Sequence, residues 1–253
     1  MPTAEQARQW LDRWDRQQEH YLPDREERFT VIADVVAATT ERPNPLVIDI
    51  GAGPGSLSVR LLDRLPAAQI VAVDADATLL GLARAAYGDR RRLRIVEQDL
   101  REPGWGEALG LYRQADAVVS TTALHWLTEA ELAALYRDCA ALLRPGGVLI
   151  NGDHLDEPAG RSRLGALQRQ VHRVRSERVG VLDHEDWGAW WRAVAEAPEL
   201  VDLTAGREPR PLDHNVPEPP AYDDHVRLLR SAGFAEVGTV WQHGHDRVLV
   251  AIR

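Results

Sequence analysis

The sequence contains no lysine, so all of its 30 basic residues are arginine. This absence excludes Schiff-base chemistry and a lysine general base, and we attribute it to genomic base composition. The single cysteine, Cys139, excludes an internal disulfide and fits a reducing compartment, so we expect a cytoplasmic protein. No apolar run is long enough for a transmembrane helix, and the N-terminus lacks the apolar segment of a signal peptide. We therefore expect neither a membrane span nor a secretory signal.

Length and charge narrow the class of protein further. The chain has 253 residues, which suits one large domain or one domain with a sizeable insertion. Hydrophobic residues make up 44% of the sequence, enough for a substantial core. The formal net charge of −9 argues against binding along a nucleic-acid backbone. We expect no nucleic-acid partner.

The most informative stretch runs from Val47 to Ser58. An apolar segment ending at Ile50 is followed by Gly51, Gly53 and Gly55, and then by residues with helical spacing. This pattern predicts a strand, a tight turn and a helix, the first unit of an open parallel sheet. Glycines let a ligand lie against the backbone, and the following helix points free N–H groups at that ligand.

The same stretch resembles the first motif of the class I S-adenosylmethionine-dependent methyltransferases. That motif is an acid followed by Gly-x-Gly-x-Gly, matched here by Asp49, Gly51, Gly53 and Gly55. A nicotinamide-binding turn would instead place its third glycine at Ser56. The resemblance implies a doubly wound, Rossmann-like α/β fold with a seven-stranded sheet, six strands parallel and one reversed.

Acidic residues follow the next two predicted strands. Asp74 ends the strand 69–74, at the distance from the turn where an acid accepts hydrogen bonds from ribose hydroxyls. The resemblance gives Asp74 this role, places Ala75 beside the adenine, and matches Asp99 to a residue that meets the adenine amino group. Asp76 is better explained as a helix N-cap, and a lone Asp99 is also a common turn former.

A loop after the fourth predicted strand, 115–120, carries the first candidate base. In this family the loop lies beside the methyl donor, so His125 is placed to take a proton from an acceptor. A packing role for His125 is an equally weighted alternative. His154 follows the fifth strand as a second candidate base. Asp153, His154 and Asp156 have metal-binding side chains, but such a cluster is a weak signal, and we predict no metal site.

Two segments outside the sheet carry most of the aromatic residues. The first forty residues predict two helices, which in related methyltransferases fold over cofactor and substrate. From Asn151 to Pro220 the pattern becomes an arginine-rich helix, a tryptophan cluster and a proline-rich loop, which we interpret as an inserted lid. The prolines of that loop are Pro209, Pro211, Pro217, Pro219 and Pro220. The aromatics either pack cap and lid onto the sheet or line an acceptor pocket.

The last part of the chain completes the predicted layout. A helix ends near Gly233, and two strands follow, joined by a tight turn at Gly244. The family closes its sheet with such a reversed hairpin. We predict a helical cap at 1–40, an α/β core at 41–152 and 221–253, and a lid at 153–220.

These observations predict an S-adenosylmethionine-dependent methyltransferase acting on a small molecule, and by family analogy an O-methyltransferase of specialised metabolism. Alternatives are a tRNA or other nucleic-acid methyltransferase, a cofactor-binding protein without methyl transfer, and a nicotinamide-dependent oxidoreductase. The predicted cofactor contacts are Asp49, Gly51, Ala52, Gly53, Gly55, Asp74, Ala75, Asp99, Leu100 and Ser120, the candidate bases are His125 and His154, and the predicted acceptor contacts are Tyr21, Trp126, Trp187 and Trp191.

Overall fold

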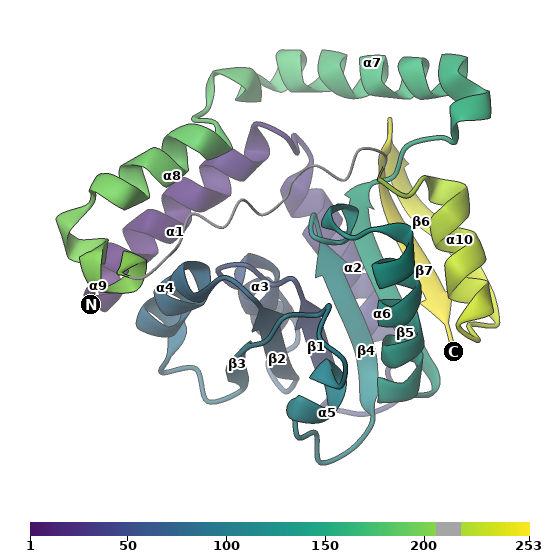
Figure 1. Ribbon diagram of the computed structural model, residues 1–253, viewed down its shortest axis with the longest axis horizontal. Coiled ribbons are helices and arrows are strands. Elements are labelled where there is room, and N and C mark those ends of the chain that lie inside the picture. The colour runs from purple at the N-terminus through teal and green to yellow at the C-terminus, as the bar shows by residue number, and fades with distance from the viewer. Residues whose placement is uncertain (206–218) are drawn as a thin grey trace.

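The computed structural model describes residues 1–205 and 219–253, and they form a seven-stranded sheet of order β3-β2-β1-β4-β5-β7-β6 (Figure 1). The predicted prolines 209, 211 and 217 lie outside the described residues. The strands are β1 (Leu46–Ile50), β2 (Gln69–Asp74), β3 (Leu93–Glu97), β4 (Ala115–Thr121), β5 (Leu143–His154), β6 (Glu236–His243) and β7 (Asp246–Ile252).

The direction of the strands matches the predicted class I methyltransferase layout. The first five strands pair in parallel, and β7 runs antiparallel to both β5 and β6. Strands β6 and β7 form the predicted hairpin, whose turn holds Gly244 at a φ of 63°. The carboxyl ends of β1 to β5 therefore meet at one edge of the sheet, where open α/β folds bind ligands.

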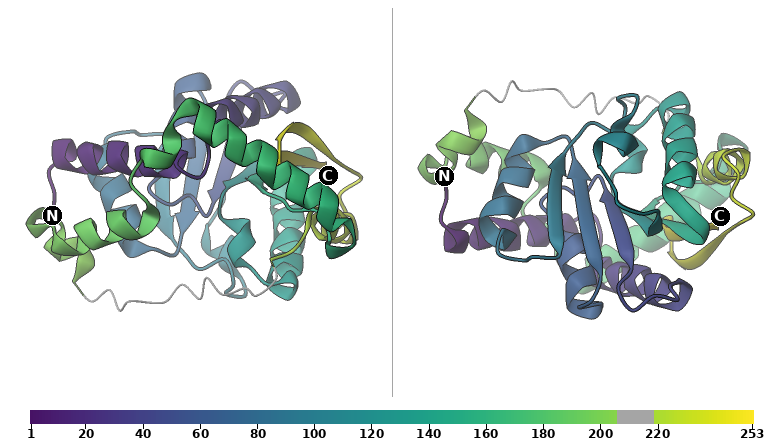
Figure 2. Two further views of the ribbon diagram at one scale, coloured as in Figure 1. Left: turned by 90° about the horizontal axis from the view of Figure 1, so that it is seen from above. Right: turned by 90° about the horizontal axis from the view of Figure 1, so that it is seen from below.

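Helices cover both faces of the sheet (Figure 2). Residues of α2 and α3 share one buried apolar cluster with the sheet, and residues of α5, α6 and α10 share another. The longer helices are α1 (Ala4–Glu19), α2 (Arg25–Thr39), α3 (Ser56–Arg64), α4 (Ala77–Tyr87), α6 (Glu129–Leu142), α7 (Ser162–Val179), α8 (Trp187–Glu196) and α10 (Tyr222–Ser231). The shorter ones are α5 (Trp105–Ala108), α9 (Val201–Thr204), and the 3-10 turns η1 (Leu124–Trp126), η2 (Ala159–Arg161), η3 (Val181–Asp183) and η4 (Pro198–Leu200).

Several helices begin at a residue whose side chain caps the first free N–H groups. Thr3 and Thr128 each complete a capping box, with Gln6 and Glu131. The Asp76 carboxylate accepts from the N–H groups of Thr78 and Leu79, which confirms its predicted role as an N-cap. These local signals fix where α1, α4 and α6 start.

The first helix and the inserted segment pack together beyond the sheet. Helix α1 lies alongside α8, and Trp190 on α8 is fully buried with its ring 4.8 Å from that of Trp14 on α1 (Figure 1). Helix α7 spans the molecule from α8 to the β6–β7 hairpin (Figure 2). Helix α1 of the predicted cap and helix α8 of the predicted lid thus share one aromatic cluster. Lid residues 206–218 lie outside the described part.

Strand β5 is the longest of the sheet and contains a Pro-Gly-Gly sequence. The Arg144–Gly147 stretch belongs to the one strand that runs from Leu143 to His154. The pairing with β4 shifts register between Ala115 and Ala117, and this irregularity accommodates the Pro-Gly-Gly sequence. Strand β5 therefore carries Asp153 and His154 at its carboxyl end.

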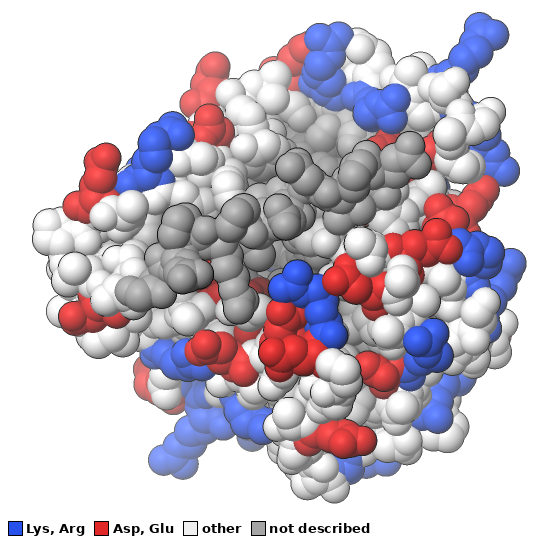
Figure 3. All heavy atoms as spheres, in the orientation of Figure 1, with Lys and Arg blue, Asp and Glu red and all other residues white. Residues whose placement is uncertain are grey.

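The surface carries charges of both signs. In the part of the chain that the structure describes, no helix is long and apolar enough to cross a lipid bilayer. Arginine and acidic side chains are interspersed on the face in Figure 3, outside the grey segment. This face thus lacks a dominant basic surface among its described residues.

Candidate active site

The glycine turn between β1 and α3 is built on strained backbone that only glycine adopts easily. Gly51, Gly53 and Gly55 have φ angles of 64°, 54° and 86°. A Cβ on Gly51 would lie 2.3 Å from the Cβ of Ala123 in the loop after β4. The turn therefore lies directly against that loop, and a side chain at position 51 is excluded by both strain and contact.

Asp74 joins the tip of β2 to this turn. Its Oδ2 accepts from the Gly53 N–H at 2.7 Å and its Oδ1 accepts from the Asp76 N–H at 2.8 Å. Burial raises the Asp74 pKa, although these N–H groups oppose the shift. Each carboxylate oxygen has a second acceptor position, so Asp74 can hold the turn and still accept from a ribose hydroxyl.

The Asp49 side chain is buried beneath the glycine turn and does not line its surface. The side chain is fully buried, and its Oδ2 accepts from the Ser58 hydroxyl at 2.6 Å. Burial raises the pKa of Asp49 to about 7, despite the Ser58 hydrogen bond and with the added effect of the Asp74 charge. Asp49 thus ties β1 to the first turn of α3, and it would act on a cofactor through the position of that turn.

The remaining predicted cofactor residues surround the same edge. Asp99 accepts from the Arg101 backbone N–H at 2.9 Å and pairs with its guanidinium at 2.7 Å, as a turn former does. An adenine contact would have to share this carboxylate with Arg101. The Ser120 hydroxyl donates to the Ile50 carbonyl at 2.9 Å, joining β4 to β1. Ala52 is buried, whereas Ala75 and Leu100 are partly buried.

The first helix brings Trp14 and Asp15 to the turn. A Cβ on Gly53 would lie 3.9 Å from the Trp14 ring. Asp15 accepts from the Ser56 hydroxyl at 2.6 Å and pairs with Arg25 and Arg60. Burial raises the pKa of Asp15, but these cations lower it more, so the carboxylate is charged. The sequence analysis missed Asp15, which locks the cap onto the start of α3.

These features fit an S-adenosylmethionine site on the turn. The positive φ angles leave a bend without side chains, and the Asp74 carboxylate stands at the next strand tip. The Trp14 ring of α1 lies beside the same turn. Backbone N–H groups and a carboxylate are the kinds of partner that a nucleoside carrying an amino-acid group uses.

The loop after β4 forms a pair with the end of β5. His125 Nδ1 lies 2.8 Å from Asp153 Oδ1. Burial lowers the pKa of His125, but the charge and hydrogen bond of Asp153 raise it more, so it lies above the ordinary value. Burial by itself would raise the pKa of Asp153. His125 and Arg28 outweigh burial and lower that pKa to about 2. Asp153 therefore orients the ring, with Nδ1 toward the carboxylate and Nε2 left for a ligand.

Arg28 is a buried cation that the sequence analysis did not select. It is fully buried, donates to the Gly152 carbonyl at 3.1 Å and to the Thr121 hydroxyl at 3.2 Å, and pairs with Asp246. A Cβ at Gly152 would lie 2.7 Å from its Cδ, so that glycine makes room for it. Its helical spacing from Phe29 and Ile32, on the apolar face of α2, is the signal that would have found it.

His154 does not join His125. Because side chains alternate along a strand, His154 projects toward α2, on the opposite face from Asp153. The predicted polar cluster also separates, since Asp156 pairs with Arg169 at 2.9 Å. Asp153, His154 and Asp156 therefore do not form one metal site.

The predicted acceptor aromatics lie in two places. Trp126 is 39% exposed and contacts the His125 ring at 4.5 Å between centroids. The Tyr21 hydroxyl accepts a hydrogen bond from the backbone N–H of Trp187 at 3.1 Å. The ring centroids of Trp187 and Trp191 are 5.9 Å apart. All four lie at least partly exposed, so a role at an acceptor pocket stays a prediction.

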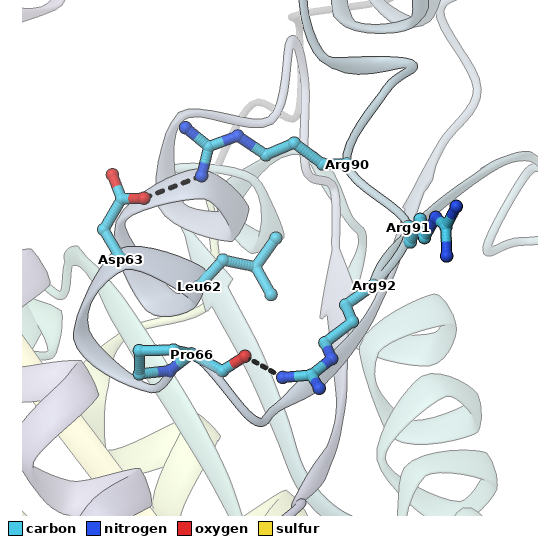
Figure 4. Close-up of a pocket in the computed structure, with 6 residues that line it drawn as sticks. All are labelled: Leu62, Asp63, Pro66, Arg90, Arg91 and Arg92. Atoms are coloured by element: carbon cyan, nitrogen blue, oxygen red, sulfur yellow. Dashed lines mark hydrogen bonds and ion pairs between the residues drawn. The ribbon is translucent and has the colours of Figure 1, made fainter.

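A separate hollow lies between α3 and the loop that precedes β3 (Figure 4). Arg90 pairs with Asp63 at 2.7 Å, and Arg92 donates to the Pro66 carbonyl. This hollow borders the amino ends of β2 and β3, at the edge opposite the glycine turn. Because parallel sheets bind ligands at their carboxyl edge, we do not assign it to the active site.

Comparison with known proteins gives a consistent result. A family model described as a methyltransferase domain matches residues 47–147. The chain is 33% identical to a trans-aconitate 2-methyltransferase of Azoarcus sp. (strain BH72) over 58% of this chain and 54% of that protein. It therefore spans about half the length of that relative. It is 30% identical to another trans-aconitate 2-methyltransferase, from Rhodopseudomonas palustris (strain BisB18), over 94% of this chain and 77% of that protein.

A solved structure shares the fold. Human N-acetylserotonin methyltransferase in complex with S-adenosylmethionine superposes with a TM-score of 0.55 and 16% identity, over 95% of this chain and 56% of that chain. At this identity the likeness concerns the fold alone.

Proposed function

We propose that this chain, which belongs to the class I S-adenosylmethionine-dependent methyltransferases, methylates a carboxylate oxygen of a small organic acid. The observation that carries the proposal is the similarity, over nearly the whole chain, to a trans-aconitate 2-methyltransferase. The sequence predicts O-methylation of a small molecule without specifying the oxygen, and this proposal specifies a carboxylate oxygen.

S-adenosylmethionine, when bound, supplies a methyl group on a positively charged sulfur. The glycine turn would hold its methionine end, Asp74 the ribose, and Asp99 the adenine, as the family resemblance implies. Helix α1 would shield this edge from water, because the Trp14 ring lies within contact distance of Gly53. Methyl transfer then needs alignment of the acceptor and removal of water more than it needs acid–base groups.

The acceptor proposed here explains the His125–Asp153 pair without a general base. A carboxylic acid with a pKa near 4 is ionised at neutral pH, so no proton must be removed. Asp153 raises the pKa of His125 against the effect of burial and so favours the imidazolium. Nε2–H of that imidazolium would donate to the acceptor carboxylate. We assign this role to His125 and not to His154, which projects to the other face.

The test is turnover with a panel of di- and tricarboxylic acids that includes trans-aconitate. We expect release of S-adenosylhomocysteine and an alkali-labile methyl ester, identified by mass spectrometry. A hydrogen bond to a charged group contributes roughly 1.5–3 kcal/mol, so His125→Ala should raise KM by roughly 10- to 150-fold and change kcat less. His184→Ala serves as the control, because His184 contacts the Arg16 carbonyl on the lid side.

Other outcomes would replace the proposal. Methylation of a phenol or alcohol, with a pH-dependent kcat that His125→Ala abolishes, would make His125 a base. Tight binding of S-adenosylhomocysteine without turnover on any acceptor would favour the cofactor-binding alternative. Salt-dependent RNA binding with methylation of that RNA would favour the nucleic-acid alternative, against which the net charge of −9 argues.

A further inference from the structure

Four side chains with metal-binding atoms meet where the lid joins the sheet. His154 ends β5 and Asp246 begins β7, and these two residues are paired across the strands. Directly opposite residues of antiparallel strands project to the same face, here the face that α2 covers. His245, in the turn before β7, accepts at its carbonyl from the Leu155 N–H at 2.9 Å.

Helix α7 brings the fourth side chain, His172. Its ring centroid lies 5.1 Å from that of His154 and 4.8 Å from that of His245, while His154 and His245 are 4.6 Å apart. The helix and the hairpin touch, since a Cβ on Gly244 would lie 2.5 Å from the Gln168 carbonyl oxygen. The three rings therefore face one another across the contact between lid and sheet.

The ring nitrogens that face this contact have no hydrogen-bond partner among the described residues. They are His154 Nε2, His172 Nε2 and His245 Nδ1, and all three atoms are buried. Buried polar atoms that are left unpaired cost free energy. Donor atoms of His154, His172 and Asp246 lie within 4.8 Å of one another, close enough to share one ion after small side-chain rotations.

The surrounding charges suit neutral imidazoles. Burial, with help from Arg28 and His245, lowers the pKa of His154 well below its ordinary value. Burial and the nearby His245 lower that of His172 to about 4. Neutral imidazole is the form that binds metal. Arg28 opposes a bound cation, but its guanidinium already pairs with Asp246.

We propose that His154, His172, His245 and Asp246 bind a divalent transition metal of the zinc class. Three imidazoles and one carboxylate are a donor set that suits such ions. Four protein ligands close the coordination shell, which is typical of a structural site. The ion would link α7 to β5 and β7 and so fix one end of the lid. It is separate from the His125–Asp153 pair, which lies on the other face of the sheet.

This proposal revises the sequence-based prediction of no metal site. The predicted candidates were neighbours in sequence, whereas the ligands proposed here come from β5, α7 and the β6–β7 hairpin. No short spacing motif joins positions 154, 172 and 245, so only the folded arrangement reveals them. The proposal does not rest on the methyl-transfer reaction.

The test uses full-length protein without a polyhistidine tag, freed of metal by dialysis against a chelator. Titration with Co²⁺ should give the visible absorption of a four-coordinate ion at about one equivalent. His172→Gln and His245→Gln, made separately, should each weaken Co²⁺ binding at least tenfold. Zn²⁺ should raise the Tm of the parent chain by several degrees and that of each variant much less.

His184→Gln is the matched control, because His184 also lies in the inserted segment but contacts the Arg16 carbonyl. Circular dichroism of every variant checks that it is folded before titration. Absence of a Co²⁺ spectrum in the folded parent chain would overturn the proposal. Equal Co²⁺ affinity in His172→Gln, His245→Gln and His184→Gln would overturn it as well.

Discussion

The two halves of the carboxyl edge of the sheet are built in different ways. At the glycine turn, the partners are near in sequence: Asp74 and Gly53 are 21 residues apart, and Ser58 and Asp49 are 9 apart. At the β4–β5 end, His125 and Asp153 are 28 residues apart, and Arg28 and Asp246 are 218 apart. Apart from its contacts with Asp15 of α1 and with the loop after β4, the half that would bind the cofactor is thus specified by residues close in sequence. The half that would bind the acceptor depends on distant charged groups brought together by the fold.

The largest effect is expected at Arg28, which holds the acceptor half together. Arg28→Met would leave the Asp246 carboxylate buried without its cation, since both side chains are almost fully buried. Loss of one partner of such a pair typically costs roughly 3–5 kcal/mol. We expect a loss of this size in the free energy of unfolding, measured by urea denaturation at pH 7 with a chelator present.

Two controls sharpen this prediction. Arg175→Met breaks an ion pair with Asp24 that is much more exposed, and it should cost about 1 kcal/mol or less. The double variant Arg28→Met with Asp246→Leu removes both charges and should recover much of the loss. Equal effects of Arg28→Met and Arg175→Met would mean that burial does not set the strength of this pair.

The next effect concerns the cofactor half. Gly51→Val adds a branched side chain at a φ of 64° and places its Cβ 2.3 Å from that of Ala123. Such backbone strain costs roughly 1–3 kcal/mol, and the contact pushes apart the turn and the loop after β4. We expect S-adenosylhomocysteine affinity, measured by calorimetry, to fall at least about 100-fold.

Gly110→Val separates strain from contact in that experiment. Gly110 has a similar φ of 53° and no atom within 4 Å of an added Cβ. This control should lose some stability and keep its affinity for S-adenosylhomocysteine. If Gly51→Val keeps full affinity while folded, the glycine turn is not the binding site.

The difference between the halves also explains what the sequence predicted. The strand order and the hairpin follow the family pattern, and the N-cap at Asp76 is a local signal that the structure confirms. Asp15 and Arg28 were missed because an acid or arginine on a helix normally faces solvent. The spacing of Arg28 along the apolar face of α2 indicates its burial. The partners of Asp15 and Arg28 are Ser56 and Asp246, which lie far along the chain and which no local pattern identifies.

The position of His154 teaches the same lesson. From the sequence, Asp153 and His154 are two polar neighbours at one strand tip. In the structure the strand alternation sends Asp153 to His125 and His154 toward α2. The face to which each side chain projects requires the register of β5 against β7, which single-sequence patterns do not supply. Candidate bases on a strand end are therefore distinguished only after the sheet is assembled.

The smallest expected effect tests the His125–Asp153 pair through pH. The folded-state pKa of His125 lies above its ordinary value of 6.5, because Asp153 outweighs burial. The folded state therefore binds the proton more tightly than the unfolded state does. The resulting stability is complete below pH 6.5 and is lost as the pH rises through the folded pKa. An ion pair with a partly exposed member contributes about 1 kcal/mol or less.

The measurement compares the unfolding free energy of the parent chain and His125→Gln between pH 5.5 and 9. Their difference should shrink as the pH rises, since Gln cannot gain a proton and the other histidines are common to both chains. Asp153→Asn should abolish the same pH dependence, because the amide keeps the shape but not the charge. A difference that grows with pH would mean that burial, not Asp153, dominates His125, and the acceptor half would then lack the cation that carboxylate binding needs.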